Sequence, residues 1–355
     1  MKILFGVQAT GNGHITRARS LAPELKRLGV EVQWLFSGRA PEQLFDMDVF
    51  GNYIVRQGMT FVTEAGKLNA VKTIQNARIG LLYKEVKSLD IEQYDLVITD
   101  FEPVSAWAAK RAGVRSIAIG HQYAFRHQIP VANETAAAKA IMRWFAPGDL
   151  EVGLHWHHFQ QPILPPLIEP EVAHTAPLNK VLVYLPFESG AQVLQMLQAQ
   201  NATFEYFCGD LAPGVYGNVT VHGFSRTNFQ TQLHQCGSVL CNAGFELASE
   251  ALQLGRRILV KPVRGQMEQC SNAAALEQLG YGSVMKTLDS KKIASWLATQ
   301  QAVAVKYPNV ANAIAHWIAS GAHESVTDLA NKLWTDAHLP AVTATSAKGF
   351  DAQLA

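Results

Sequence analysis

The chain has 355 residues, of which 48% are hydrophobic and 17% charged, with a formal net charge of +1. This length predicts two domains, because single hydrophobic cores stop growing well below this size. The composition is that of a globular protein, and the near-neutral charge argues against a general nucleic-acid binder, which needs a basic surface. Since no run of about 18 apolar residues occurs, we expect no membrane span and a cytoplasmic protein.

The first half alternates between short apolar runs and segments with helical spacing of apolar residues, which predicts a doubly wound parallel sheet. The expected strands are Lys2–Ala9, Val30–Phe36, Tyr94–Thr99 and Arg115–Ile119. The expected helices are Ile15–Leu28, Gly66–Leu89 and Val104–Ala112.

A second alternation follows a proline-rich stretch that is typical of an interdomain linker. Its expected strands are Lys180–Leu185, Thr203–Cys208, Val219–His222, Ser238–Cys241 and Arg257–Lys261, and its expected helices are Gly190–Gln198, Phe245–Leu254 and Glu268–Leu279. We therefore expect an α/β protein with an acceptor-binding domain (1–160), a linker (161–178), a nucleotide-sugar domain (179–335) and a polar tail (336–355). Two such sheets facing across a cleft suit group transfer, because ligands bind beyond the carboxyl ends of parallel strands.

The first predicted strand ends in a glycine-rich loop that includes Gly11, Asn12, Gly13 and His14. It lacks the lysine of a phosphate-binding P-loop, and no acidic residue ends the second strand to hold a dinucleotide ribose. Glycines at a helix start let another molecule approach the backbone closely. The alternative is a tight turn in which His14 has no chemical role.

This loop resembles the glycine-histidine-isoleucine loop of GT-B glycosyltransferases, including plant secondary-metabolite enzymes and the N-acetylglucosaminyltransferase that forms lipid II. The resemblance implies that His14 is the general base that deprotonates the acceptor. It also implies that Asp100, at the end of a predicted strand, orients that histidine, as a carboxylate can by fixing the tautomer. Two alternatives stay open: Glu102 could take this role, and Asp100 could be a helix N-cap before Pro103.

Other residues of the first half are weaker candidates. His121 and Gln122 follow the next strand and resemble, in position only, a segment of the lipid II enzyme, so we expect them to line the cleft. His155, His157 and His158 cluster in sequence, but no acidic or cysteine partner is suitably spaced, so we favour a structural role and predict no metal site.

The second half carries the more specific pattern, a strand, a glycine turn and a helix over Asn242–Glu250. Gly244 and Phe245 stand where a helix begins, and backbone N–H groups at a helix start can hold a diphosphate without a metal. Glu250 lies about one and two-thirds turns further on, where a carboxylate can accept both hydroxyls of a ribose. Gln269 begins the next predicted helix and can donate to sugar hydroxyls, with Asn272 one turn along to orient it.

This segment resembles the donor-binding region of the lipid II enzyme. The spacings from Glu250 to Gly255 and from Gln269 to Asn272 are the same as in that enzyme. The same resemblance implies that Phe224 and Ser225 belong to the segment that recognises the nucleotide base. It also implies that Ser189 and Gly190 belong to a loop that faces the phosphates. That loop has fewer glycines here. The chain also resembles a little-characterised set of bacterial and archaeal GT-B proteins that share the segment Asp100–Pro103.

These patterns predict a glycosyltransferase that moves a sugar from a nucleotide-diphosphate donor, with UDP favoured by the resemblance, to an unknown acceptor hydroxyl. The reaction is expected to be inverting and metal-independent, with the nucleotide-sugar as co-substrate and no other cofactor. The alternatives are a non-hydrolysing UDP-sugar 2-epimerase and a non-catalytic nucleotide-sugar-binding protein. The apolar and basic segment Ile141–Phe145 has two interpretations. It makes peripheral contact with the inner membrane face, or it packs into the first domain as an ordinary helix. The sequence leaves the oligomeric state open.

Overall fold

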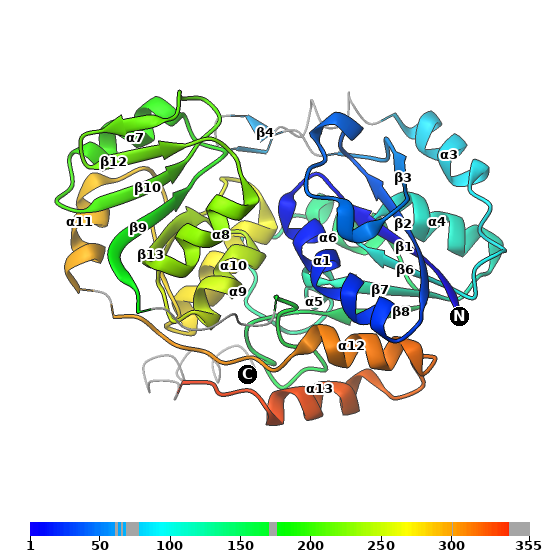
Figure 1. The fold of residues 1–355 in the computed structure, drawn as a ribbon. Helices are drawn as coiled ribbons and strands as arrows, with labels where there is room; N and C mark the ends of the chain where they lie inside the picture. The colour runs from blue at the N-terminus through cyan, green and yellow to red at the C-terminus, as the bar shows by residue number, and fades with distance from the viewer. Residues whose placement is uncertain (61–62, 65–66, 69–77, 170–175, 300, 341–355) are drawn as a thin grey trace.

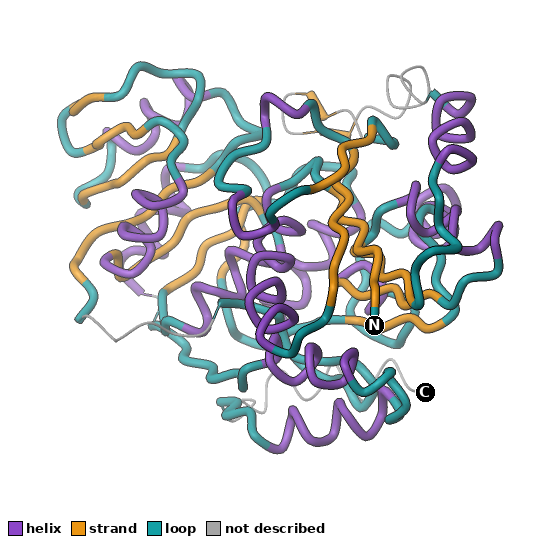
Figure 2. The backbone as a smooth tube through the Cα atoms, turned by 45° about the vertical axis from the view of Figure 1, so that its right-hand side comes forward, coloured by secondary structure: helices purple, strands orange, loops and turns teal. Residues whose placement is uncertain are grey.

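The structure, a computed structural model, describes residues 1–60, 63–64, 67–68, 78–169, 176–299 and 301–340. Its described strands form two large sheets, one from each half of the chain, and a small two-stranded ladder. Figures 1 and 2 show the two sheets standing apart, with helices from both halves between them. This arrangement confirms the expected α/β class with two Rossmann-like sheets.

The N-terminal sheet has six parallel strands in the order β3-β2-β1-β6-β7-β8. Its strands are β1 (Lys2–Gln8), β2 (Glu31–Ser37), β3 (Tyr53–Arg56), β6 (Leu96–Asp100), β7 (Ser116–Gly120) and β8 (Leu150–Gly153). The strands are short apolar runs because helices cover both faces of a parallel sheet. β1 lies between β2 and β6, and the loop after it therefore lies centrally on the carboxyl edge.

Helices and short 3-10 turns connect these strands. They are α1 (Asn12–Arg27), η1 (Pro41–Gln43), η2 (Asp48–Phe50), α3 (Ile79–Ser88), α4 (Pro103–Ala112), α5 (His121–Ala124) and α6 (Ala136–Trp144). The apolar face of α1, with Ile15, Ala18, Leu21 and Leu25, is buried in the main core. This burial fixes the start of α1, and with it His14, over the end of β1.

The C-terminal sheet has seven strands in the order β11-β12-β10-β9-β13-β14-β15, parallel except for β11 at the edge. Its strands are β9 (Leu178–Tyr184), β10 (Thr203–Phe207), β11 (Gly214–Tyr216), β12 (Val219–His222), β13 (Cys236–Asn242), β14 (Arg257–Lys261) and β15 (Ser283–Val284). The strand order reverses between β9 and β13, which is the point where open sheets of this type bind ligands.

The helices of the second half are α7 (Gly190–Gln198), α8 (Arg226–Gln235), α9 (Phe245–Gln253), α10 (Met267–Gln278), α11 (Ser290–Thr299), α12 (Val310–Ala319) and α13 (Val326–Thr335). The chain returns to the N-terminal half after α11, because α12 packs against α1. Arg115 of the first half donates to the Gly321 and Ala322 carbonyls. The expected domain limits remain a prediction.

Most expected elements of both halves are confirmed to within about two residues, but the expected helix over Gly66–Leu89 is confirmed only in its last part and is wrong at Lys67–Leu68, which form a strand. Helix α3 begins only at Ile79, and residues 69–77 lie outside the described part of the chain. Before it, β4 (Thr63–Glu64) and β5 (Lys67–Leu68) pair antiparallel, so hydrogen bonds between strands replace those of a helix. None of the helices in the described residues is long and apolar enough to cross a membrane.

Candidate active site

His14 lies in the first turn of α1, directly after the glycine loop that ends β1. Gly11 is the helix N-cap and has no side chain with which to cap it, so the first N–H groups of α1 receive no side-chain hydrogen bond from that position. The His14 side chain is 14% exposed and Asp100, the last residue of β6, is 4% exposed. Because β1 and β6 are neighbours, with Val7 opposite Asp100, the two side chains meet at the carboxyl edge.

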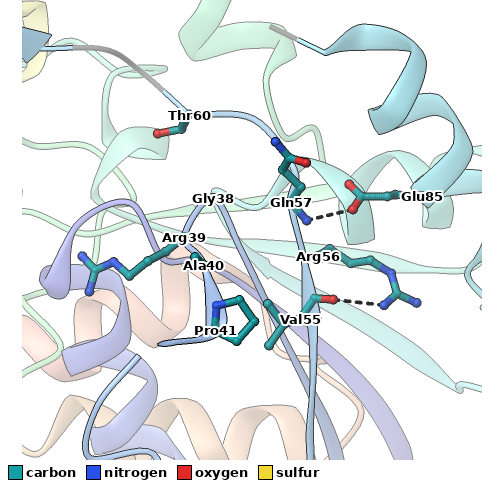
Figure 3. A pocket seen from close by; sticks show the side chains of 9 residues that line it. All are labelled: Gly38, Arg39, Ala40, Pro41, Val55, Arg56, Gln57, Thr60 and Glu85. Atoms are coloured by element: carbon teal, nitrogen blue, oxygen red, sulfur yellow. Dashed lines mark hydrogen bonds between the residues drawn. The ribbon is translucent and has the colours of Figure 1, made fainter. Parts of the chain in front are cut away.

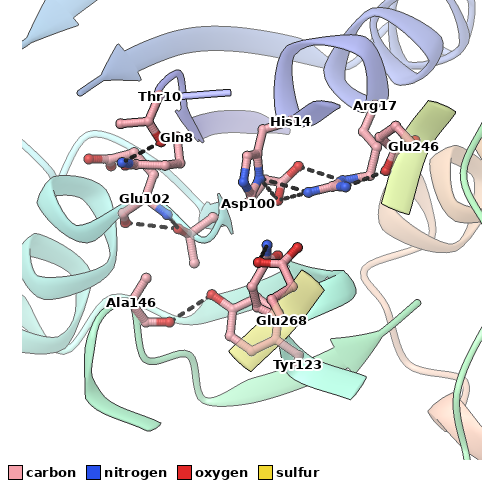
Figure 4. A network of polar contacts seen from close by, with 12 residues as sticks. Gln8, Thr10, His14, Arg17, Asp100, Glu102, Tyr123, Ala146, Glu246 and Glu268 are labelled. Carbon is pink, nitrogen blue, oxygen red and sulfur yellow. Dashed lines mark hydrogen bonds and ion pairs between the residues drawn. The ribbon is translucent and has the colours of Figure 1, made fainter. Parts of the chain in front are cut away.

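His14 Nδ1 lies 2.8 Å from Asp100 Oδ1 (Figure 4). The buried Asp100 carboxyl has a pKa below its usual value; burial opposes this shift, but the charges of Arg17 and His14 and their hydrogen bonds outweigh it. Asp100 is therefore ionised at neutral pH. An ionised carboxylate at Nδ1 can hold the proton on that nitrogen and leave Nε2 as a base.

Glu102 does not contact His14 in the structure. It is the N-cap of α4, and its carboxyl oxygens accept hydrogen bonds from the Val104 and Ser105 N–H groups, both at 2.7 Å. The Ser37 hydroxyl donates to it as well, at 2.7 Å. Burial raises the Glu102 pKa against these bonds. The alternative that Asp100 caps this helix is wrong, since Glu102 does so.

Arg17, one turn along α1, was not among the expected site residues. Its Nε and Nη2 donate to the two oxygens of Asp100 at 2.8 and 2.7 Å, which is a bidentate ion pair. Its Nη1 pairs with Glu246 of α9, on the other half of the chain. Burial lowers the Arg17 pKa, but Asp100 and Glu246 together raise it above its usual value. Arg17 thus links the two halves at the site, as Figure 4 shows.

The contacts of His14 Nδ1 require opposite tautomers. Arg17 Nη2 lies 2.7 Å from this nitrogen and, as a donor, would need a lone pair on it. Asp100 Oδ1, at 2.8 Å, needs a proton there. Only the tautomer that suits Asp100 leaves the Nε2 lone pair free to accept a proton from a substrate.

Glu246 is 6% exposed, and its Oε2 has no hydrogen-bond partner among the described residues. Burial raises its pKa to about 8, although Arg17 acts in the opposite direction. Its approach to α1 explains Gly13, because a Cβ there would lie 2.9 Å from Glu246 Cγ. A Cβ on Gly11 would meet nothing within 4 Å.

Three further contacts join candidates of the two halves. His121 Nε2 lies 2.6 Å from Asn272 Oδ1, and the His121 ring stacks on Phe245 with centroids 4.0 Å apart. Gln122 Nε2 donates to Glu268 Oε2 at 3.1 Å, while its buried Oε1 has no partner in the described chain. Burial lowers the His121 pKa, so this ring is neutral. The predicted acceptor-side pair thus meets the predicted donor side directly.

The remaining donor-side candidates lie at the ends of β13 and β14. Gly244 is the N-cap of α9, and open space adjoins its Cα. Glu250 is half-buried and accepts from Gln230 Nε2 at 3.0 Å; burial raises its pKa to about 7. The buried Gln269 accepts from the Val263 N–H at 2.9 Å, so its carbonyl oxygen fixes a loop. Asn272 binds His121 and the Ala243 carbonyl and does not orient Gln269.

The loops expected to contact the nucleotide base and the phosphates lie near a pocket of about 170 Å³ at the ends of β9 and β10. Phe224, 59% exposed, lines it, and Ser225 caps α8 by accepting from the Asn228 N–H. Ser189 is the N-cap of α7, and the Gly190 N–H donates to Asp210 at 3.2 Å. These four candidates therefore surround one region of the carboxyl edge.

Sequence reasoning also missed a buried ion pair between Lys261 and Glu188. Lys261 ends β14 opposite Asn242, and its side chain reaches the loop after β9. A charged residue ending an apolar strand is the signal that could have found it. The same signal was absent for Arg17, which stands within an ordinary amphipathic helix pattern.

The histidine cluster and the segment 141–145 are the remaining sequence features. His155 is buried among Trp156, Phe159 and Phe245, and in the described residues no three His, Cys, Asp or Glu side chains are placed to hold a metal ion. In the segment 141–145, Phe145 is 8% exposed and Trp144 52% exposed. The segment therefore packs partly into the core and partly faces solvent.

Comparisons with known proteins identify a family and similar folds. The profile of glycosyl transferase family 1 matches residues 1–300. The glycosyltransferase of kitacinnamycin has a similar fold, at TM-score 0.58, 15% identity and coverage of 96% of this chain and 99% of that one. The glycosyltransferase VinC in complex with dTDP matches at TM-score 0.52 and 16% identity, with coverage of 94% of this chain and 99% of that one. Arabidopsis thaliana UGT89C1 complexed with quercetin matches at TM-score 0.55 and 14% identity, with coverage of 99% of this chain and 98% of that one. No curated protein sequence matches.

The two facing Rossmann-like sheets define a GT-B protein. The chain belongs to glycosyl transferase family 1. It is therefore a nucleotide-sugar-dependent glycosyltransferase, as the sequence predicted, and the epimerase and the non-catalytic alternatives lose their support. Enzymes of this family typically use nucleotide-sugar donors without a metal ion.

Proposed function

We propose that this chain transfers a sugar from a UDP-sugar to an acceptor hydroxyl, with inversion at the anomeric carbon and without a metal ion. The observation that carries the proposal is the 2.8 Å contact between His14 Nδ1 and Asp100 Oδ1, across from the open start of α9 at Gly244. A base on one half and an anion-binding helix start on the other are what an in-line displacement needs.

In this mechanism His14 Nε2 takes the proton of the acceptor hydroxyl as its oxygen attacks the anomeric carbon. The bond from that carbon to the diphosphate oxygen breaks, and the nucleotide diphosphate leaves with the electron pair. Asp100 stabilises the imidazolium that forms, and the N–H groups at the start of α9 stabilise the leaving diphosphate. General base catalysis of this kind contributes roughly 10²- to 10⁴-fold to the rate.

The donor assignment rests on the second half. Glu250 would accept from the ribose hydroxyls, and Phe224 and Ser225 would contact the base. Glu268, beside Gln269, is a further candidate for the sugar hydroxyls, because its carboxylate contacts Gln122 near the His14 cluster. VinC was solved in complex with dTDP, and dTDP is therefore the principal alternative to UDP in our proposal.

A thermal-shift screen with UDP-, dTDP- and GDP-sugars tests the donor. A ligand at 100 times its dissociation constant should add about 2.7 kcal/mol to stability. We expect the largest shift with UDP-sugars, and a larger shift with dTDP-sugars would contradict that choice. A shift with none of the three would count against the whole proposal.

We further propose that the chain acts in the cytoplasm and that α6 makes peripheral contact with the inner membrane face. The four cysteines are free thiols, which suits a reducing compartment. The exposed Trp144 has Arg143 at 5.3 Å and Lys110 Nζ at 5.5 Å from its ring, an aromatic and basic surface that suits anionic lipid. Flotation with anionic vesicles tests the contact, and failure of the protein to float would contradict it.

A further inference from the structure

A pocket of about 670 Å³ lies at the carboxyl ends of β2 and β3, on the edge of the N-terminal sheet that also carries His14. Figure 3 shows Arg39 on one side of it and Arg56 with Glu85 on the other. Pro41 and Val55 contribute an apolar part of the lining. Its position fits the rule that open parallel sheets bind ligands beyond the carboxyl ends of their strands.

The acidic residue of this lining does not neutralise its arginines. The two oxygens of Glu85 accept from the Gln57 and Gly58 N–H groups, at 2.8 and 2.9 Å. Arg56 donates to the carbonyl of its own neighbour Val55 at 3.0 Å. Two arginines therefore line the pocket, with side chains that extend to opposite sides of it in Figure 3, while its carboxylate accepts hydrogen bonds from the backbone.

Arg39 has only neutral partners among the side chains and backbone that the structure describes. Its Nη1 donates to Asn12 Oδ1 at 2.9 Å, and its Nη2 donates to the Thr10 carbonyl at 3.2 Å. Partial burial lowers the pKa of this guanidinium below its usual value. A half-buried cation without a counter-ion is unfavourable, and an anion bound beside it would relieve that cost.

A third arginine, which does not line the pocket, interacts electrostatically with Arg39. Arg19 of α1 is 8% exposed and donates to the Phe45 and Asp46 carbonyls at 2.7 and 3.1 Å. Burial lowers its pKa and the charges of Arg226 and Arg39 act in the same direction, whereas the carboxylates of Asp46 and Glu169 oppose them. Two cations that destabilise each other on one edge of the sheet favour an anionic ligand more than either would alone.

We propose that this pocket binds the acceptor through an anionic group, a carboxylate or a phosphate, that pairs with Arg39. The inference rests on the proposed function, in which the N-terminal sheet holds the acceptor. The guanidinium fork matches both anions in a bidentate manner. The bonds from Arg39 to Thr10 and Asn12 connect the pocket to the loop that leads into His14, so an anion held there lies on the acceptor side of the base.

Two matched pairs of probes test the proposal, with binding followed by saturation-transfer NMR on the full chain. Glucuronate and glucose 6-phosphate are each compared with neutral glucose, because the three share a ring and differ in charge. The variants are Arg39→Met, which keeps much of the apolar stem, and Arg27→Met as a control on an exposed ion pair of α1. UDP binding is measured on each variant by calorimetry.

We expect at least one of the two anions to bind better than glucose, and the preferred anion shows whether a carboxylate or a phosphate is the group recognised. Arg39→Met should weaken that binding about tenfold or more, and added salt should weaken it as well. Arg27→Met should leave it unchanged, and UDP affinity should be the same in all three proteins.

Three results of the anion-binding measurements would overturn the proposal. These are equal binding of glucose and both anions, no binding of either anion, and binding that Arg39→Met leaves unchanged. Loss of UDP affinity in Arg39→Met would also overturn it, because Arg39 would then serve the donor diphosphate. Failure of the wild-type chain to bind UDP would contradict the proposed UDP donor, while the comparison of anions with glucose would still decide the role of Arg39.

Discussion

Arg17 of α1 and Glu246 of α9 form a buried ion pair across the interface between the two halves of the chain. The same guanidinium holds both oxygens of Asp100, which contacts His14. The carboxylate beside the candidate base is thus held by a residue that itself depends on the position of the other half. In the proposed function the second half binds the donor, and this link then joins the geometry of the base to the approach of that half.

The first prediction concerns the base. His14→Ala should lower the rate of transfer about 10²- to 10⁴-fold, because it removes the group that accepts the acceptor proton. UDP affinity should stay the same, since His14 lies on the other half. Kinetics with UDP calorimetry on the same samples measures both quantities. The exposed His323→Ala is the matched control, and a His14→Ala enzyme with wild-type turnover would exclude the proposed role.

The second prediction concerns Arg17. Arg17→Lys keeps the charge but cannot make the bidentate contact with Asp100 and reach Glu246 as well. We expect kcat to fall by up to about 100-fold, as a misplaced catalytic group does, with little change in the donor KM. Unequal effects on kcat and KM separate positioning from a general loss of folding. A variant with unchanged kcat, or one whose KM alone rises, would contradict this role.

Gly13 and Gly11 offer a comparison within one loop. Gly13→Ala places a Cβ 2.9 Å from Glu246 Cγ, whereas Gly11→Ala meets nothing within 4 Å. Gly13→Ala should destabilise the fold by about 1–3 kcal/mol and slow transfer, because the halves can no longer approach as closely. Denaturant unfolding and turnover of the two variants test this. Equal behaviour of both alanine variants would show that the close contact has no consequence.

Glu246 gives a pH dependence of stability with a definite sign. Its pKa is about 8 in the folded chain against an ordinary value of 4.5, so the folded state binds the proton more tightly. Its contribution to stability is therefore complete below about pH 4.5 and is lost as the pH rises through 8. Wild type should lose stability relative to Glu246→Gln across this range. A constant difference between the two unfolding free energies would refute the raised pKa.

Glu250 tests the donor half separately. Glu250→Ala should weaken UDP binding roughly 10- to 100-fold, the usual effect of losing hydrogen bonds to a charged group. The exposed Glu277→Ala, on the neighbouring α10, should bind UDP as wild type does. Calorimetry on the two variants decides the point. If Glu250→Ala retained full affinity, the ribose would have to be bound elsewhere.

The sequence predicted the two sheets because buried parallel strands are short apolar runs, and such runs are visible without a structure. The contact of His14 with Asp100 was implied by the family resemblance and not by spacing, and the structure forms it because β1 and β6 are neighbours. The sequence could not predict Arg17 or Glu246 as site residues. Their partners lie 83 and 229 positions away, and only the packing of the two halves brings them together.

The same limit explains the residues that took other places. Glu102 was considered as a partner of His14, and Gln269 as a donor of hydrogen bonds to sugar hydroxyls. Local backbone groups compete for such side chains, and in the structure Val263 N–H and the start of α4 bind them. Spacing along one helix cannot say which of two adjacent residues, such as Glu268 and Gln269, turns toward the other half.

The most direct test of the central claim is an NMR time course of the protein with an α-linked UDP-sugar, in which water can serve as a slow acceptor. We expect release of UDP, with the sugar appearing first as its β-anomer, and loss of this activity in His14→Ala. First appearance of the α-anomer would contradict an inverting displacement. Formation of the C2 epimer of the UDP-sugar would contradict the transferase mechanism itself.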